Sequence, residues 1–162
     1  MASILTTGGR TVLAEAISVL PIFLAIGQGD PAWDAAPVSP SPDATALSNE
    51  IGRRIVDRTR FVVDDPAGEI VLSHGRYTVS ETPTHQLLLE VKFGFGDAAN
   101  LTIREVGVFI GTEPVTGLPA GQRYFAPSEI ADPGDLFSLD RLAAPLQKTA
   151  AFEIDFSHVL TL

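Results

Sequence analysis

Hydrophobic and polar residues follow two different periods along the chain. Near the N-terminus apolar residues recur at helical spacing, which predicts a helix over residues 8–18 capped by Thr6 or Thr7. An apolar run over residues 21–26 is bounded by proline and glycine, as expected of a buried strand. Later apolar stretches are short and separated by Gly, Pro, Asn and Asp clusters, which is typical of antiparallel sheets. These later strands are predicted at residues 54–63, 70–72, 77–80, 85–95, 101–110 and 122–125.

Together these elements predict an α+β fold of one domain spanning residues 1–162. The fold is expected to be mainly antiparallel β, with a sandwich-like sheet, an N-terminal helix and a second short helix. The second helix is expected near residues 43–50, where Asp43 or Thr45 can cap a brief turn. Residues 112–162 are expected to form an irregular segment, rich in proline and glycine up to residue 133, and then a C-terminal strand.

A long loop is predicted over residues 27–42, directly after the first strand. Its prolines fix their own φ angles and favour extended geometry in the preceding residue, so the loop is expected to be stiff. Long ordered loops in small domains are more often functional than idle. The prolines are Pro31, Pro37, Pro40 and Pro42.

Two glycines at the start of this loop raise the question of a nucleotide site. A dinucleotide fingerprint needs a third glycine and the N-terminus of a helix. Here Gly27 and Gly29 are followed by Asp30, which repels phosphate, and by Pro31, which has no amide to donate. The pair is therefore interpreted as a turn that starts the loop.

Composition excludes several kinds of functional site and several kinds of partner. The chain has no cysteine, which excludes disulfides, thiolate metal sites and cysteine nucleophiles. Its formal net charge of −9 repels phosphate backbones and anionic lipids, so neither nucleic acid nor a membrane is an expected partner. No apolar stretch approaches the roughly 20 residues that cross a bilayer. No signal peptide is recognised at the N-terminus, so the protein is expected to remain where it is made.

No set of residues suggests catalysis, a metal or a cofactor. Ser73 and His74 are adjacent, but neighbours in a strand point to opposite faces. Three acids near residue 65 lack the ligand spacing of calcium loops, and a solvated turn is favoured. The histidines are too scattered to form a metal site. We therefore expect no enzyme and no cofactor.

Candidate partner contacts stand out more clearly. Trp33, the only tryptophan, lies in the proline-rich loop between two acids and is expected either to cover the core or to anchor an interface. Arg104 and Glu105 precede an apolar run and could pair with each other, with the sheet or with a neighbour. The C-terminal strand presents apolar residues to a core or to another subunit. The predicted contact residues are Asp30, Trp33, Asp34, Arg104, Glu105, Phe109, Phe152, Ile154 and Phe156.

Four stretches occur in an order that resembles a known family. They are ILTTGGRTVLAEAI (4–17), LAIGQGDPAWD (24–34), DATALSNEIGRRIV (43–56) and LTIREVGVFIG (101–111). In this order they resemble bacteriophage tail-collar fibre proteins and related tail fibre N-terminal domains. The resemblance covers residues 4–111, a fibre-attachment-like region, and implies a structural virion protein without enzymatic activity. It also implies a place in the tail or baseplate after synthesis in the host cytoplasm.

The resemblance implies two alternative roles. Fibre proteins of this type continue into a long shaft or a receptor-binding tip, and these 162 residues contain no glycine-rich or repeated shaft. This favours an adaptor that attaches tail fibres to the baseplate or tail, or a small decorating subunit. The alternative is a small carbohydrate-binding module for host attachment, suggested by Trp33 between Asp30 and Asp34. Partners are expected to be other tail or baseplate proteins and the fibre, with copies arranged in three-fold or six-fold symmetry. The expected contact surfaces are residues 27–42, 104–109 and 152–162.

Overall fold

The structure is a computed structural model that describes residues 3–36 and 38–162. Pro37, part of the predicted stiff loop, lies outside the described residues. Contacts divide the chain into two compact units, each built from separate segments. The first contains the N-terminal residues up to Leu20, residues 57–90 and residues 156–162, and the second contains residues 21–56 and 91–155. The single domain stays a prediction.

The first unit contains the N-terminal helix and a sheet. Helix α1 (Thr7–Ser18) begins one residue before the predicted start. Of the two predicted caps it uses Thr6, whose side-chain oxygen accepts a hydrogen bond of 3.2 Å from the amide of Gly9. The sheet has the order β12-β6-β3-β5-β4. Val62, Tyr77, Leu88 and Val159 form its core. The strands are β3 (Arg58–Asp64), β4 (Ile70–Leu72), β5 (Gly75–Val79), β6 (Gln86–Phe93) and β12 (Ile154–Thr161).

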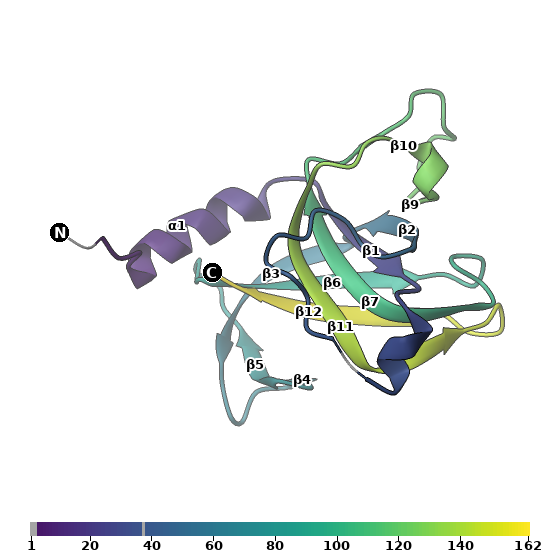
Figure 1. Ribbon diagram of the computed structural model, residues 1–162. Coiled ribbons are helices and arrows are strands. Elements are labelled where there is room, and N and C mark those ends of the chain that lie inside the picture. Colours follow the sequence, from purple (N-terminus) through teal and green to yellow (C-terminus); the bar gives the residue numbers. More distant parts are fainter. Residues whose placement is uncertain (1–2, 37) are drawn as a thin grey trace. The chain divides into compact units, whose positions relative to one another are not determined.

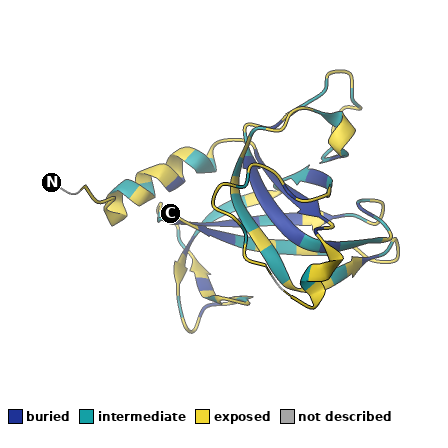
Figure 2. Ribbon diagram, viewed as in Figure 1, coloured by how far each residue is buried: buried dark blue, intermediate teal, exposed yellow. Residues whose placement is uncertain are grey.

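The second unit is built on a five-stranded antiparallel sheet in the order β11-β7-β1-β2-β9 (Figure 1). β1 is central and all six of its residues are buried, which explains its uninterrupted apolar sequence (Figure 2). Phe23, Ala25, Leu47, Phe109 and Phe125 form the core of this unit. The strands are β1 (Ile22–Gly27), β2 (Glu50–Ile55), β7 (Leu101–Ile110), β9 (Tyr124–Phe125) and β11 (Asp135–Lys148), with a small pair β8 (Glu113–Pro114) and β10 (Ile130–Asp132).

The predicted antiparallel sheets and N-terminal helix are confirmed, but the second short helix is wrong. Residues 41–49 contain turns in place of a helix, with the amide of Ala44 bonded to the carbonyl of Ser41 and with Asn49 in the left-handed region at φ 56°. Besides α1, the described residues contain only two short 3-10 turns, η1 (Pro31–Asp34) and η2 (Pro127–Glu129). The sandwich-like packing stays a prediction.

The long strand predicted over residues 54–63 is also wrong. β2 ends at Ile55 and β3 begins at Arg58. The amide of Val56 donates to Ile22 at 2.8 Å, whereas the amide of the next residue, Asp57, donates to Glu90 at 2.9 Å. The chain therefore leaves one sheet and enters the other between two adjacent residues. A further difference is β11, the longest strand, which the sequence pattern did not predict.

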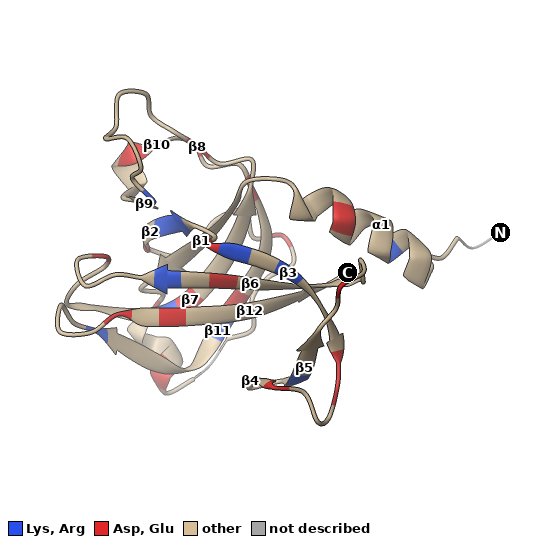
Figure 3. Ribbon diagram, turned by 180° about the vertical axis from the view of Figure 1, so that it is seen from behind, with Lys and Arg blue, Asp and Glu red and all other residues tan. Residues whose placement is uncertain are grey.

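Basic and acidic residues are distributed over many strands (Figure 3). Along single strands such as β3 and β6, Lys or Arg occurs together with Asp or Glu. No helix in the described part of the chain is both long and apolar enough to cross a membrane.

Candidate functional site

The segment after β1, residues 28–42, is held by two arginines of the same sheet, and we call it the clamped loop (Figure 1). The first is Arg104 of β7. Its Nε and Nη2 donate to the two carboxylate oxygens of Asp34 at 2.8 and 2.9 Å, and its Nη1 donates to the carbonyl of Gln28 at 3.1 Å. This bidentate pair is the strongest geometry available to an exposed ion pair. Hydrogen bonding from Arg104 lowers the pKa of Asp34 and keeps it ionised.

Hydrogen bonds within the clamped loop shape its first turn. The side chain of Asp30 accepts a 2.9 Å hydrogen bond from the amide of Ala32 and so caps η1. Gly29 has a φ of +59°, and a Cβ added there would lie 2.3 Å from the Trp33 ring. The glycine turn predicted at this point is confirmed for Gly29, because only glycine suits both the backbone and the close approach.

The second arginine is Arg141 of β11. Its guanidinium lies 3.8 Å from the centre of the Trp33 ring, in a cation–π contact. Its Nη1 donates to the carbonyl of Val38 and, at 3.2 Å, to that of Ser39. Arg141 thus holds the far half of the clamped loop, while Arg104 holds the near half.

A pocket of about 300 Å³ lies between the clamped loop and β11. β11 pairs with β7 up to Arg141 and again from Leu146, and the register shifts between them. The unpaired residues, which include Pro145, leave the ladder and form one wall of the pocket, as bulged edge strands commonly do. Trp33, Asp34, Arg104, Asp140 and Arg141 line it together with apolar Val38, Pro40, Leu142, Ala143 and Pro145.

Glu105 lies beneath this surface rather than on it. In the sheet it stands opposite Gly27 on one side and Arg141 on the other. Its side chain is fully buried, and a Cβ on Gly27 would come within 2.6 Å of it. Neither carboxylate oxygen accepts a hydrogen bond of normal geometry. The nearby backbone of Ser48 acts to lower the pKa of Glu105, but burial has the larger effect. Burial therefore raises the pKa of Glu105 and favours its neutral form.

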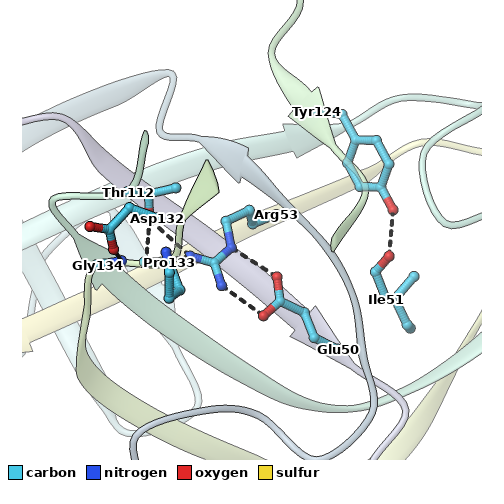
Figure 4. A network of polar contacts seen from close by, with 8 residues as sticks. All are labelled: Glu50, Ile51, Arg53, Thr112, Tyr124, Asp132, Pro133 and Gly134. Atoms are coloured by element: carbon cyan, nitrogen blue, oxygen red, sulfur yellow. Dashed lines mark hydrogen bonds and ion pairs between the residues drawn. The ribbon is translucent and has the colours of Figure 1, made fainter. Parts of the chain in front are cut away.

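Phe109 is 1% exposed and packs in the core against Arg53. Arg53 of β2 donates to both carboxylate oxygens of Glu50 at 2.8 and 2.7 Å (Figure 4). Its Nη1 also donates to the Thr112 hydroxyl at 2.8 Å and to the Pro133 carbonyl at 2.7 Å. We call these residues the Arg53 clasp; the sequence analysis did not detect it.

A buried lysine organises the turn before β12. Lys148 is fully buried, and its Nζ donates to the carbonyls of Phe95, Thr149 and Phe152 at 3.3, 2.9 and 2.8 Å. Phe152 itself is 40% exposed, whereas Ile154 and Phe156 are half-buried. Lys148 therefore fixes the backbone that presents Phe152 to solvent.

The structure brings together only part of the predicted contact set. Asp30, Trp33, Asp34 and Arg104 all belong to the clamped loop or hold it. Glu105 and Phe109 are buried, so a partner that docks on this surface does not reach them. Phe152, Ile154 and Phe156 do not line the pocket, and their role as contacts stays a prediction. Sequence reasoning missed Arg141, because it lies in the strand that was not predicted.

The described residues contain no group of three or more His, Asp or Glu side chains placed to hold a metal ion. Asp65, one of the acids weighed for calcium, instead accepts hydrogen bonds from the Thr78 hydroxyl at 2.7 Å and from the Ala67 amide at 2.9 Å. These hydrogen bonds lower the pKa of Asp65. They give this residue a structural role in a hairpin turn.

Comparison with known proteins identifies the family. A family model described as "Baseplate wedge 3 tail fiber network component" matches residues 1–162, the whole of the sequence. No curated protein matches the chain. The match confirms the resemblance to phage tail fibre and baseplate attachment proteins. The chain therefore belongs to the baseplate wedge 3 tail fiber network component family, a structural part of the phage tail.

Proposed function

We propose that this chain is an adaptor that attaches tail fibres to the baseplate, and that it binds a neighbouring virion protein through the clamped loop. The observation that carries this proposal is the double arginine clamp on a solvent-exposed loop. A loop already held in one conformation loses little freedom when it docks, so its contacts contribute more fully to affinity.

The clamp is difficult to explain by stability alone. Asp34 is 38% exposed, and exposed ion pairs contribute only about 0 to 1 kcal/mol. Arg141 binds carbonyls of a loop whose residues are mostly exposed. What these contacts do achieve is a defined shape for the loop and for the pocket beside it, and shape is what an interface requires.

The same groups bear on the alternative role in carbohydrate binding. Trp33, Asp30 and Asp34 suggested a sugar site, since an aromatic face beside acids can stack on and bond to a sugar. Here Arg141 lies over the Trp33 ring, Asp30 caps η1 and Asp34 is held by Arg104. Because these groups already have partners within the chain, the structure favours the adaptor over host attachment through a sugar.

The remaining parts of the proposal follow from the family. A network component of the baseplate binds other baseplate and tail fibre proteins, and we propose that its copies follow the three-fold or six-fold symmetry of the tail. We further propose that its role is structural rather than enzymatic and that it is made in the host cytoplasm before assembly.

The test is fibre attachment by phage that carry Arg104→Ala. This change removes the bidentate bond to Asp34 and the bond to Gln28, so we expect loop 28–42 to exchange amide hydrogens faster and most particles to lack fibres in electron micrographs. The matched control is Arg58→Ala, which removes an exposed arginine of β3 whose ion pair with Glu90 is 3.9 Å long. Normal fibre numbers on particles whose loop exchanges faster would contradict the proposal.

Deletion of residues 152–162 is a poor test by comparison. That segment contains β12 and the buried residues Val159 and Leu160. Its loss would remove a strand and part of the core, so missing fibres would not distinguish a lost contact from an unfolded protein.

A further inference from the structure

We infer that the pocket beside the clamped loop receives an acidic side chain of a different virion protein, and that Arg141 pairs with its carboxylate. This inference rests on the proposed function, because it names the chemistry of the partner at the same site. It begins from an imbalance of charge in the pocket.

Arg141 has no carboxylate partner, although the chain has an excess of acids. There are 20 Asp and Glu residues against 11 Lys and Arg. Within the described residues no carboxylate lies within 4.0 Å of Arg141, and its hydrogen-bond acceptors are two backbone carbonyls. Three other arginines of the same unit pair with an acid: Arg53 with Glu50, Arg54 with Asp97 and Arg104 with Asp34.

The other charged groups at the pocket do not neutralise Arg141. Asp34 is bound by both branches of the Arg104 guanidinium. Asp140, the other acid in the lining, has an interaction of its own within the chain. Within the described residues, the contacts of Arg141 thus include no ion pair and no hydrogen bond to a carboxylate.

Glu105 is the acid that the sheet register places opposite Arg141, and it does not form an ion pair with Arg141 either. The two residues face each other across β7 and β11. Glu105 is nevertheless fully buried beside Gly27, and neither of its carboxylate oxygens has a hydrogen-bond partner in the described residues. Arg141 acts on it through its charge, without an ion pair within 4.0 Å. The sheet thus holds Arg141 at the pocket as a cation with an unused capacity for an anion.

The surroundings suit a carboxylate from a protein side chain. A guanidinium offers donors in a planar fork that matches a carboxylate, and such bonds are stronger where apolar walls exclude water. Val38, Pro40, Leu142 and Pro145 supply those walls. The pocket, at about 300 Å³, is at the small end of ligand sites, which fits one or two inserted side chains. We therefore expect the partner to present an aspartate or glutamate next to an apolar residue.

The pairing can be tested in solution, because Trp33 is the only tryptophan and lies against Arg141. The purified chain is titrated with acetyl-Leu-Glu-Leu-amide and with its neutral isostere acetyl-Leu-Gln-Leu-amide while Trp33 fluorescence is followed. We expect a saturable change with the glutamate peptide, about tenfold weaker with the glutamine peptide, and weakened by salt. Arg141→Gln should remove the difference between the peptides, and Arg58→Gln should keep it. Equal responses to both peptides, or none to either, overturn the inference.

A second test uses the assembled particle. Phage with Arg141→Glu should lose fibres, and revertants that regain them should carry an Asp or Glu changed to Lys or Arg in another virion protein. Compensating changes inside this chain, or only changes without charge, would overturn the inference. If Arg104→Ala removes fibres while Arg141→Gln does not, the acidic partner is wrong and the adaptor role stands. If neither removes them, the proposed function itself fails.

Discussion

Two arginines of this protein lie over aromatic rings in nearly the same way, yet their surroundings differ completely. The guanidinium of Arg53 lies 3.9 Å from the centre of the Phe109 ring, and that of Arg141 lies 3.8 Å from the centre of the Trp33 ring. Arg53 is 2% exposed and bonds to a carboxylate, a hydroxyl and a carbonyl. Arg141 bonds only to carbonyls, lines a pocket, and has an Nε without a partner in the described residues.

The difference shows how one residue type serves two purposes. In the Arg53 clasp every strong interaction is made within the chain, so the arginine contributes to the folded state and is closed to others. At the clamped loop the chain supplies the aromatic ring and the carbonyls but not the anion. An arginine with an unmet charge at the surface is suited to a partner, and Arg is enriched at the centres of interfaces for this reason.

The largest expected effect comes from breaking the Arg53 clasp. Arg53→Ala leaves the Glu50 carboxylate without its ion pair, and it removes the donor to the Thr112 hydroxyl and one of the two donors to the Pro133 carbonyl. Removing one member of a buried pair costs about 3 to 5 kcal/mol. Urea unfolding followed by circular dichroism should show this loss of stability. A loss below about 1 kcal/mol would mean that Arg53 contributes no more to stability than an exposed ion pair does.

Removing both members of the pair should restore much of that loss. In the double variant Glu50→Leu/Arg53→Leu no buried charge remains unpaired, and apolar replacements of buried ion pairs are often neutral or stabilising. We expect the double variant to be more stable than Arg53→Ala in the same urea titration. If the double variant instead loses as much stability as the two single substitutions together, the two residues are not coupled. The clasp then acts only through packing.

The next largest effect on stability depends on pH. It concerns Glu105, which lies opposite Arg141 in the sheet. Burial raises its pKa above the usual value of 4.5, so the folded state binds the proton more tightly than the unfolded state. Stability should therefore fall as pH rises from 4.5 through the raised value, and Glu105→Gln should remove this decline. Unfolding free energies of both proteins between about pH 4 and pH 8 test it. Parallel curves would mean that folding does not raise the pKa of Glu105.

The smallest effect on stability is expected for Arg141→Gln. It removes one cation–π contact and hydrogen bonds to carbonyls that water can replace, which amounts to about 1 kcal/mol or less. Thermal unfolding should thus barely separate this variant from the wild type, while fibre attachment falls. A loss comparable to that of Arg53→Ala would show that Arg141 is part of the fold and would remove the contrast between the two arginines.

The sequence revealed the local parts of the candidate site and missed the distant part. The loop, Trp33, Asp34 and Arg104 were found because prolines, glycines and a lone tryptophan mark a stiff turn locally. Arg141 was missed because β11, with Ala143, Ala144 and Pro145 in its bulged middle, lacks the alternation of a half-buried strand. A strand at the edge of a sheet tolerates proline and a broken register, so its pattern is weak.

The fold was likewise predicted where neighbours in sequence decide it. The continuous apolar run of β1 and the full length of β7 were predicted well, since both are buried strands with strong patterns. Residues 54–63 also had a strand pattern, but periodicity does not show which sheet a strand joins. That depends on the separate partners Ile22 and Glu90, which are far away in sequence.

The burial of Lys148 determines what chemical labelling of the particle can report. The lysines of the chain are Lys92, whose side chain is 52% exposed, and Lys148, whose amine is enclosed by three carbonyls. Amine-reactive cross-linkers applied to intact virions should therefore modify the lysine side chains of this protein at Lys92 alone. Any protein cross-linked through a lysine side chain is then a neighbour of the surface that carries Lys92, Glu153 and Asp155.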